Sequence, residues 1–87
     1  MHASGKTEPS NAIQARVQDV FRAELDDEDL VIGPDTGQNN LKAWDSLAHI
    51  RLMSGIENEF GIEFNVAEIE QLTSVRQLVQ AIEERSR

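Results

Sequence analysis

The chain has 87 residues, and its 16 acidic residues outnumber its 8 basic ones, giving a net charge of −8. This length allows one small domain and excludes a two-domain enzyme, and the acidity argues against a nucleic-acid partner, whose phosphates need a basic surface. The absence of cysteine excludes a disulfide framework and a thiolate metal site. No run approaches the roughly 18 apolar residues of a membrane span, and residues 1–10 lack the apolar run of a secretory signal, so we expect a cytoplasmic protein.

The first ten residues differ in pattern from the rest of the chain. Residues 1–10 are small and polar and show no periodicity, which predicts a disordered tail. We expect residues 11–87 to form one folded domain.

A first amphipathic helix is predicted from Asn11 to Leu25. Its apolar residues recur at the three- and four-residue spacing of a helix that buries one face. They are Ile13, Val17, Val20, Phe21 and Leu25. A long loop over residues 26–43 follows, and three apolar residues are its expected anchors in the core: Leu30, Ile32 and Leu41.

The acidic run Asp26–Asp29 at the start of this loop raises the question of a calcium site. A calcium-binding loop of the EF-hand type needs glycine at its sixth position and a closing glutamate at its twelfth. Counted from Asp26, those positions hold Val31 and Gly37. The pattern therefore indicates a solvated acidic turn, and we expect no metal site.

The most regular helical pattern runs from Ser46 to Phe60. Asp45 is a favourable N-cap, because its carboxylate can accept from free backbone N–H groups one turn further on. Gly61 is the expected helix stop. Gly55 weakens the helix by about 1 kcal/mol relative to alanine, but it would permit a close helix contact. The predicted buried stripe consists of Leu47, Ile50, Met53, Ile56 and Phe60.

Two further helices complete the chain. Asn65 can cap a short helix over residues 66–70, which is expected to bury Val66 and Ile69. The sequence Ser74–Gln77 is typical of a capping box and would begin a final helix that runs to about residue 84. Each helix has one apolar face, so the helices must pack on one another. The expected fold is all-α, a four-helix bundle with three long helices, one short third helix and a long loop between the first two.

Ser46 stands at the N-terminus of the central helix, near the positive end of the helix dipole. As an ordinary helix-start serine it would contribute only to capping. As an attachment point for a phosphate ester it would place the phosphate against free backbone N–H groups. Taken alone, a serine at this position favours the first interpretation.

The tripeptide Asp45-Ser46-Leu47 opens a helix that ends in Glu57-Asn58-Glu59-Phe60-Gly61-Ile62. This combination resembles the acyl carrier protein family, and the resemblance extends from Asn11 to Arg85. In that family the serine carries 4′-phosphopantetheine, which a phosphopantetheinyl transferase moves from coenzyme A, and the thiol of the arm holds an acyl, aminoacyl or polyketide group as a thioester. The resemblance therefore implies a monomeric, non-enzymatic phosphoprotein that presents cargo to acyl-loading and acyl-processing enzymes, for example in lipid or polyketide biosynthesis.

The resemblance also implies partner contacts. Asp45 would help to present the serine to the transferase, and Leu47 would be an exposed apolar contact, with core packing as an equal alternative. The fatty-acid type of carrier has acidic residues along the first turns of this helix and often a large apolar residue where this chain has Ser54. Here those turns hold Ala48, His49 and Arg51, so we expect enzymes of fatty-acid synthesis to bind this chain poorly. The residues assigned to transferase or partner recognition are Asp45, Leu47, His49, Arg51, Ser54 and Glu57.

Several alternatives stand beside this interpretation. The pair Ser46 and His49 lacks an orienting acid and an oxyanion loop, so it predicts no catalysis, and His49 is expected on the surface. Trp44 would either pack over the end of the bundle or shape the surroundings of the arm. The alternative functions are a peptidyl or aminoacyl carrier and an unmodified helical interaction module, in which Ser46 would only cap its helix.

Overall fold

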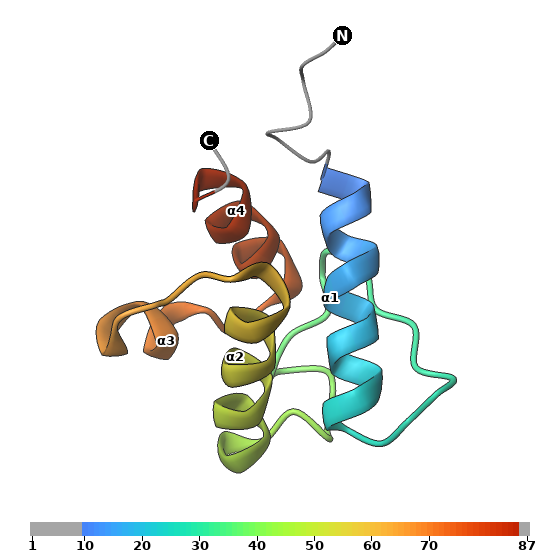
Figure 1. Cartoon of the computed structure of the whole chain (residues 1–87). Coiled ribbons are helices and arrows are strands. Elements are labelled where there is room, and N and C mark those ends of the chain that lie inside the picture. The colour runs from blue at the N-terminus through green and yellow to red at the C-terminus, as the bar shows by residue number, and fades with distance from the viewer. Residues whose placement is uncertain (1–9, 86–87) are drawn as a thin grey trace, which may run out of the picture.

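Four helices and their connections make up residues 10–85, the part of the chain that this computed structural model describes (Figure 1). The helices are α1 (Ser10–Glu24), α2 (Ser46–Phe60), α3 (Val66–Gln71) and α4 (Val75–Arg85). The predicted four-helix bundle, with its short third helix and long first loop, is confirmed. Of the tail predicted for residues 1–10, Ser10 begins α1, and the rest lies outside the described residues. Between residues 10 and 85 no helix is long and apolar enough to cross a membrane.

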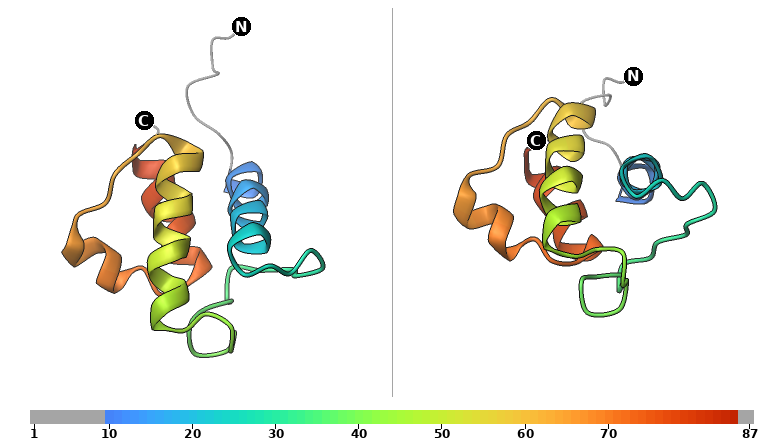
Figure 2. Two further views of the ribbon diagram at one scale, coloured as in Figure 1. Left: turned by 60° about the horizontal axis from the view of Figure 1, so that its bottom comes forward. Right: turned by 90° about the horizontal axis from the view of Figure 1, so that it is seen from below.

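The long helices pack side by side, with α1 against both α2 and α4. Figures 1 and 2 show α1 on one side of the α2–α4 pair and α3 on the other. The chain leaves the lower end of α1 in Figure 1, and α2 begins at that same end, so α1 and α2 run antiparallel. The start of α2 therefore lies at one end of the bundle, together with the long loop.

The long loop is fixed to the bundle by apolar anchors and by backbone hydrogen bonds. Ile32 is buried, while Leu30 and Leu41 are partly buried against the core, as predicted. The Gln38 N–H donates to the carbonyl oxygen of Thr73 over 3.0 Å, and an isolated antiparallel bridge pairs Gly37 with Ser74. The loop is thus attached to the start of α4.

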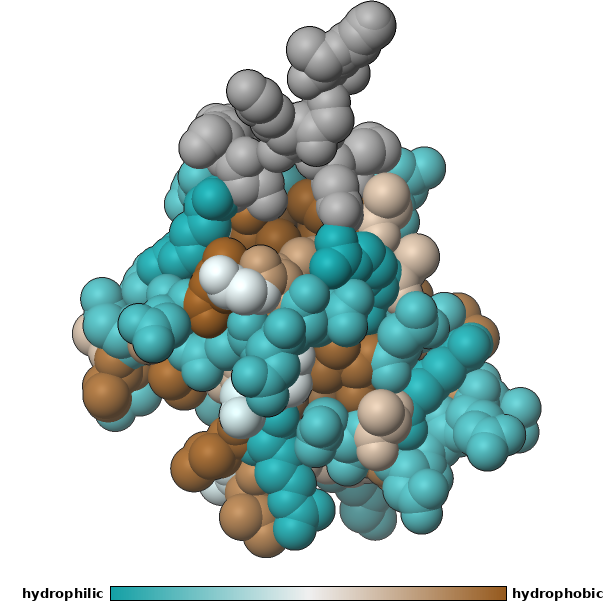
Figure 3. Space-filling view, in the orientation of Figure 1, coloured by the Kyte–Doolittle hydropathy of each residue, from teal (hydrophilic) through white to brown (hydrophobic). Residues whose placement is uncertain are grey.

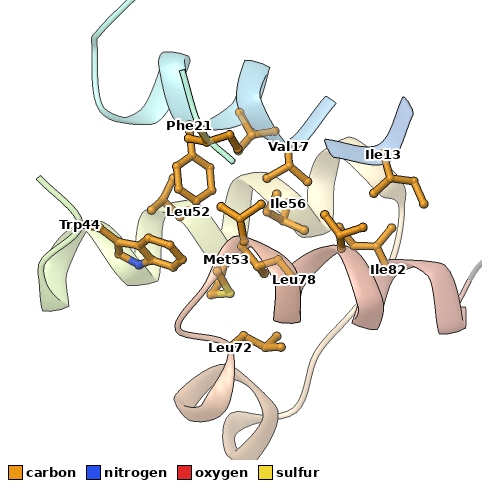
Figure 4. Packing of buried hydrophobic residues seen from close by; sticks show 14 of the residues in the cluster. Ile13, Val17, Phe21, Trp44, Leu52, Met53, Ile56, Leu72, Leu78 and Ile82 are labelled. Carbon is orange, nitrogen blue, oxygen red and sulfur yellow. The ribbon is translucent and has the colours of Figure 1, made fainter. Parts of the chain in front are cut away.

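One hydrophobic core joins three of the helices, the long loop and the segments around α3 (Figure 4). Its largest fully buried side chains include Trp44 and Phe21. Within α3 no residue is buried, and Ile69 is partly buried against the core. The core consists of Ile13, Val17, Val20, Phe21, Ile32, Trp44, Leu52, Met53, Ile56, Phe64, Leu72, Val75, Leu78, Val79 and Ile82.

The ends of α2 and α3 follow their predicted signals, whereas the capping box predicted for α4 forms only in part, because Gln77 accepts from the N–H of Thr73 and not from that of Ser74. Gly61 terminates α2 in the left-handed conformation, with φ of 65°. Asn65 caps α3 in a reciprocal capping box with Glu68. At the start of α4 the Ser74 hydroxyl accepts from the Gln77 N–H over 3.3 Å, while Gln77 Oε1 accepts from the Thr73 N–H over 3.0 Å.

The structure corrects the predicted burial on α2 and α3. Ile50 and Val66 were expected in the core but are 65% and 72% exposed. For Leu47, an exposed contact and core packing were equal alternatives, and the side chain is 63% exposed. His49, expected on the surface, is only 8% exposed. Helix α2 has more apolar residues than one face can hold. Periodicity alone therefore predicted a buried face that is rotated by about one residue from the face that the structure buries. The residues that α2 buries are Ala48, His49, Leu52, Met53 and Ile56.

Candidate functional site

Ser46 is the first residue of α2 and is exposed. The preceding residue, Asp45, is the N-cap: its Oδ1 accepts from the Ala48 N–H over 2.8 Å. Its carbonyl oxygen accepts from the His49 N–H, also over 2.8 Å. The capping hydrogen bond of the helix is therefore made by Asp45, and the Ser46 side chain is not needed for it.

The surroundings of the Ser46 hydroxyl fit a phosphodiester. The first N–H groups of a helix have no partner inside the helix and carry a partial positive charge. Within residues 10–85, the N–H groups of Ser46 and Leu47 have no described acceptor, and neither does the Ser46 hydroxyl. An anionic ester on this oxygen would face those donors at the positive end of the helix. Ser46 is thus the residue that could hold a 4′-phosphopantetheine arm.

Trp44 fixes the segment that leads into the helix. It is only 1% exposed, and its ring meets Phe21 of α1 edge-on, with centroids 5.0 Å apart. Its indole N–H donates to Nδ1 of His49 over 2.9 Å. The expectation that Trp44 packs over the end of the bundle is confirmed, and the packed indole lies two residues before Ser46.

Both ring nitrogens of His49 are engaged. Nδ1 accepts from Trp44, and Nε2 lies 2.6 Å from the carbonyl oxygen of Ile69 in α3. An indole N–H can only donate and a carbonyl can only accept, so the proton of the neutral ring is on Nε2. Neither nitrogen is free to take a proton from Ser46, so the structure gives no support to a serine–histidine pair.

The outward face of α2 next to Ser46 carries two apolar side chains, one basic side chain and no acidic one. Leu47, Ile50, Arg51 and Ser54 are all exposed, and their spacing puts them on one face of the helix. From Ser46 to Ile56 the only charged residue is Arg51, in a chain with 16 acidic residues. Figure 3 shows apolar surface at the lower left, where α3 and the first turns of α2 lie.

A groove between α2 and α3 borders this face. It is lined by Ile50, Met53, Ser54, Glu57, Val66 and Ile69. Glu57, predicted as a recognition residue, is half-buried, and its carboxylate accepts from the Phe64 N–H over 2.8 Å. Glu57 therefore binds the segment that connects α2 to α3. His49, predicted on the same surface, lies on the opposite, core-facing side of α2.

The acidic residues between positions 10 and 85 can also be compared with the requirements of a metal site. In the part of the chain that the structure describes, no group of three or more His, Cys, Asp or Glu side chains is placed to hold a metal ion. In the run Asp26–Asp29, Asp27 Oδ1 accepts from the Asp29 N–H over 3.1 Å. A side chain that accepts from the backbone N–H two residues further on is typical of a turn.

Comparisons with known proteins agree with this geometry. Residues 12–82 match the family model described as the phosphopantetheine attachment site. The fold is similar to the solution NMR structure of holo acyl carrier protein from Geobacter metallireducens, with a TM-score of 0.75 and 29% sequence identity over 83% of each chain. A search of curated proteins found no match.

Proposed function

Because this chain belongs to the phosphopantetheine attachment site family, we propose that Ser46 carries its 4′-phosphopantetheine arm. The protein is a carrier and not an enzyme. When bound, the arm supplies a thiol on which cargo is held as a thioester. The protein's own residues hold the arm, orient it and present a surface to partner enzymes.

The proposal is supported by the different roles of Asp45 and Ser46 at the start of α2. Asp45 makes the capping hydrogen bond over 2.8 Å, while the exposed Ser46 hydroxyl has no described partner between residues 10 and 85. A serine that served only as a cap would accept from an N–H group of the first turn. This argues against the unmodified interaction module, in which capping would be the only role of Ser46.

The cargo that we propose is an acyl-type intermediate. The support is the similarity to a holo acyl carrier protein. An aminoacyl or peptidyl carrier would use the same serine and the same fold. A role in lipid or polyketide biosynthesis and a cytoplasmic location stay predictions of the sequence.

Carriers of this family interact with a phosphopantetheinyl transferase and with acyl-processing enzymes. We propose that the docking face here is the exposed side of α2, formed by Leu47, Ile50, Arg51 and Ser54, with Asp45 beside the serine. Along α2 itself, a partner with a basic docking patch would meet Arg51 and no acidic residue before Glu57, so Asp45 at the N-cap is the one acid near the serine. We therefore expect enzymes of fatty-acid synthesis to acylate this carrier more slowly than their own, and equal turnover would contradict that expectation.

The test of the attachment site is intact mass, with peptide mapping, after incubation with a broad-specificity phosphopantetheinyl transferase and coenzyme A. One phosphopantetheine increment is expected on the peptide that contains Ser46. It should be absent in Ser46→Ala and present in Ser10→Ala, a control at the opposite end of the bundle (Figure 1). An increment on Ser46→Ala, or none on folded wild-type protein beside a working control carrier, would refute the assignment.

A further inference from the structure

His49 is the one polar or charged residue that is buried among residues 10–85. A carrier does not need a histidine for its chemistry, because the thiol of the arm holds the cargo. Burying a polar ring is unfavourable unless its nitrogens are hydrogen-bonded. In this protein both nitrogens have partners, and the two partners belong to different segments of the chain.

The two hydrogen bonds form a chain that starts two residues before Ser46 and ends in α3. The Trp44 indole N–H donates to Nδ1 over 2.9 Å, and the two rings lie within 22° of parallel. The Nε2–H donates to the Ile69 carbonyl oxygen over 2.6 Å. His49 itself is the fourth residue of α2, three residues after Ser46.

This chain of bonds matters for Ser46 because of what lies on either side of it. Trp44 is followed directly by Asp45, the N-cap that orients the first turn, so the position of the indole helps to fix the backbone at the serine. On the other side, α3 buries none of its residues. A direct bond from α2 therefore helps to hold α3, which forms one wall of the groove beside the docking face.

We propose that His49 is a positioning residue for the modification of Ser46. Through its bond to Trp44, His49 holds the backbone at Ser46 in place, and through its bond to Ile69 it connects the start of α2 to α3. The proposal rests on the assignment of Ser46 as the attachment residue. Loss of the Nδ1 bond frees the indole and lets the segment before α2 shift. A misplacement of about 1 Å from a change away from the reacting atoms can lower a rate by up to about 100-fold.

Two conservative variants cut the two bonds separately. In His49→Asn the amide oxygen lies close to the place of Nδ1, so the bond from Trp44 is kept and the bond to Ile69 is lost. In His49→Gln the amide nitrogen lies close to the place of Nε2, so the bond to Ile69 is kept and the bond from Trp44 is lost. Each variant removes one hydrogen bond of His49, of which the bond from Trp44 is buried and the bond to Ile69 is partly buried. A merely structural role would therefore lower the stability of both variants and slow the loading of each in step with its own loss of stability.

The first measurement is NMR of the wild type and both variants. Trp44 is the only tryptophan, so its indole N–H resonance is unambiguous. We expect this resonance to shift in His49→Gln and to stay near the wild-type position in His49→Asn. The resonance of the Ile69 carbonyl carbon should shift in His49→Asn and stay near the wild-type position in His49→Gln. An indole resonance that does not move in His49→Gln would overturn the proposal, because the bond would then be absent in the wild type.

The second measurement is the rate at which a phosphopantetheinyl transferase loads each variant from coenzyme A. We expect kcat/KM to fall about tenfold in His49→Gln, within the loss of up to about 100-fold that a misplaced reacting group can cause, and to change less than about twofold in His49→Asn. Ile82→Val, a core change in α4, controls for lost stability. Should His49→Gln fail to fold, Trp44→Phe removes the same bond from its donor side, and the same loss is expected.

The outcomes separate this proposal from the proposed function. Equal loading of His49→Gln, His49→Asn and wild type, with the modification still on Ser46, would overturn the positioning role and leave the carrier assignment intact. Wild-type protein that takes up no arm on Ser46 would refute the carrier assignment, and the positioning role with it. A selective loss in His49→Gln would support both.

Discussion

Gly55 offers the sharpest test of how α1 and α2 pack, because a single methyl group decides the outcome. A Cβ built on Gly55 would lie 2.7 Å from Cγ1 of Val20 and 3.3 Å from Cγ of Glu24. Two carbon atoms normally approach to about 3.5–4.0 Å. The close helix contact that the sequence allowed is thus present, and an added methyl group overlaps a branched, stiff side chain.

Two opposing terms set the effect of Gly55→Ala on the free energy of unfolding. Alanine is favoured over glycine inside a helix by about 0.8–1.0 kcal/mol. Overpacking a filled site costs about 1–3 kcal/mol. The net expectation is a loss of about 0–2 kcal/mol, and each kcal/mol lowers the Tm of a domain of this size by about 4–8 °C.

The matched experiment places the same substitution in a Val20→Ala background, which removes the atom that clashes. There the helix-propensity term should dominate, so Gly55→Ala should raise stability by up to about 1 kcal/mol. The double-mutant cycle, measured by urea unfolding, should give a coupling energy of about 1–3 kcal/mol. If Gly55→Ala stabilises the wild type and the Val20→Ala variant equally, the close approach of α1 and α2 at this site is refuted.

Two further predictions concern carboxylates at helix starts. Asp45→Ala should lower the free energy of unfolding by about 1 kcal/mol, whereas Asp45→Asn keeps the cap and should lose less; equal losses in thermal unfolding would contradict the capping role. The pKa of Glu68 is held below its usual 4.5, first by the Asn65 N–H and then by Arg85. The ionised carboxylate therefore stabilises the fold above pH 4.5, and that contribution is lost as the pH falls through the lowered pKa. Wild type should thus be more stable than Glu68→Gln at neutral pH and lose this advantage in acid; a difference that does not depend on pH would disprove the link.

The sequence by itself determined the features that depend on contacts within one helical turn. The Asp45 cap, the Gly61 stop and the Asn65 cap were all predicted and are all present. Each satisfies backbone groups one turn away or needs a local backbone conformation, so neighbours in the chain suffice to specify it. For the same reason the sequence could place Ser46 at the N-terminus of the central helix.

The tertiary structure decided which face of α2 meets the core. Leu47 and Ile50 are as apolar as Leu52 and Met53, and only packing against α1 and the rest of the core determines which pair is buried. Periodicity therefore gave the helix but not the correct rotation about its axis.

His49 and Val66 show the same limit most clearly. A histidine is stable inside this core because Trp44 donates to one nitrogen and the Ile69 carbonyl accepts from the other, and the second partner comes from a helix 20 residues further along the chain. Val66 is exposed because α3 packs against the bundle through Ile69 and the adjoining Leu72, on a side that its own six residues do not reveal. Whether a polar ring is buried or an apolar side chain is exposed depends on which groups the rest of the fold places next to it. The local sequence does not contain that information.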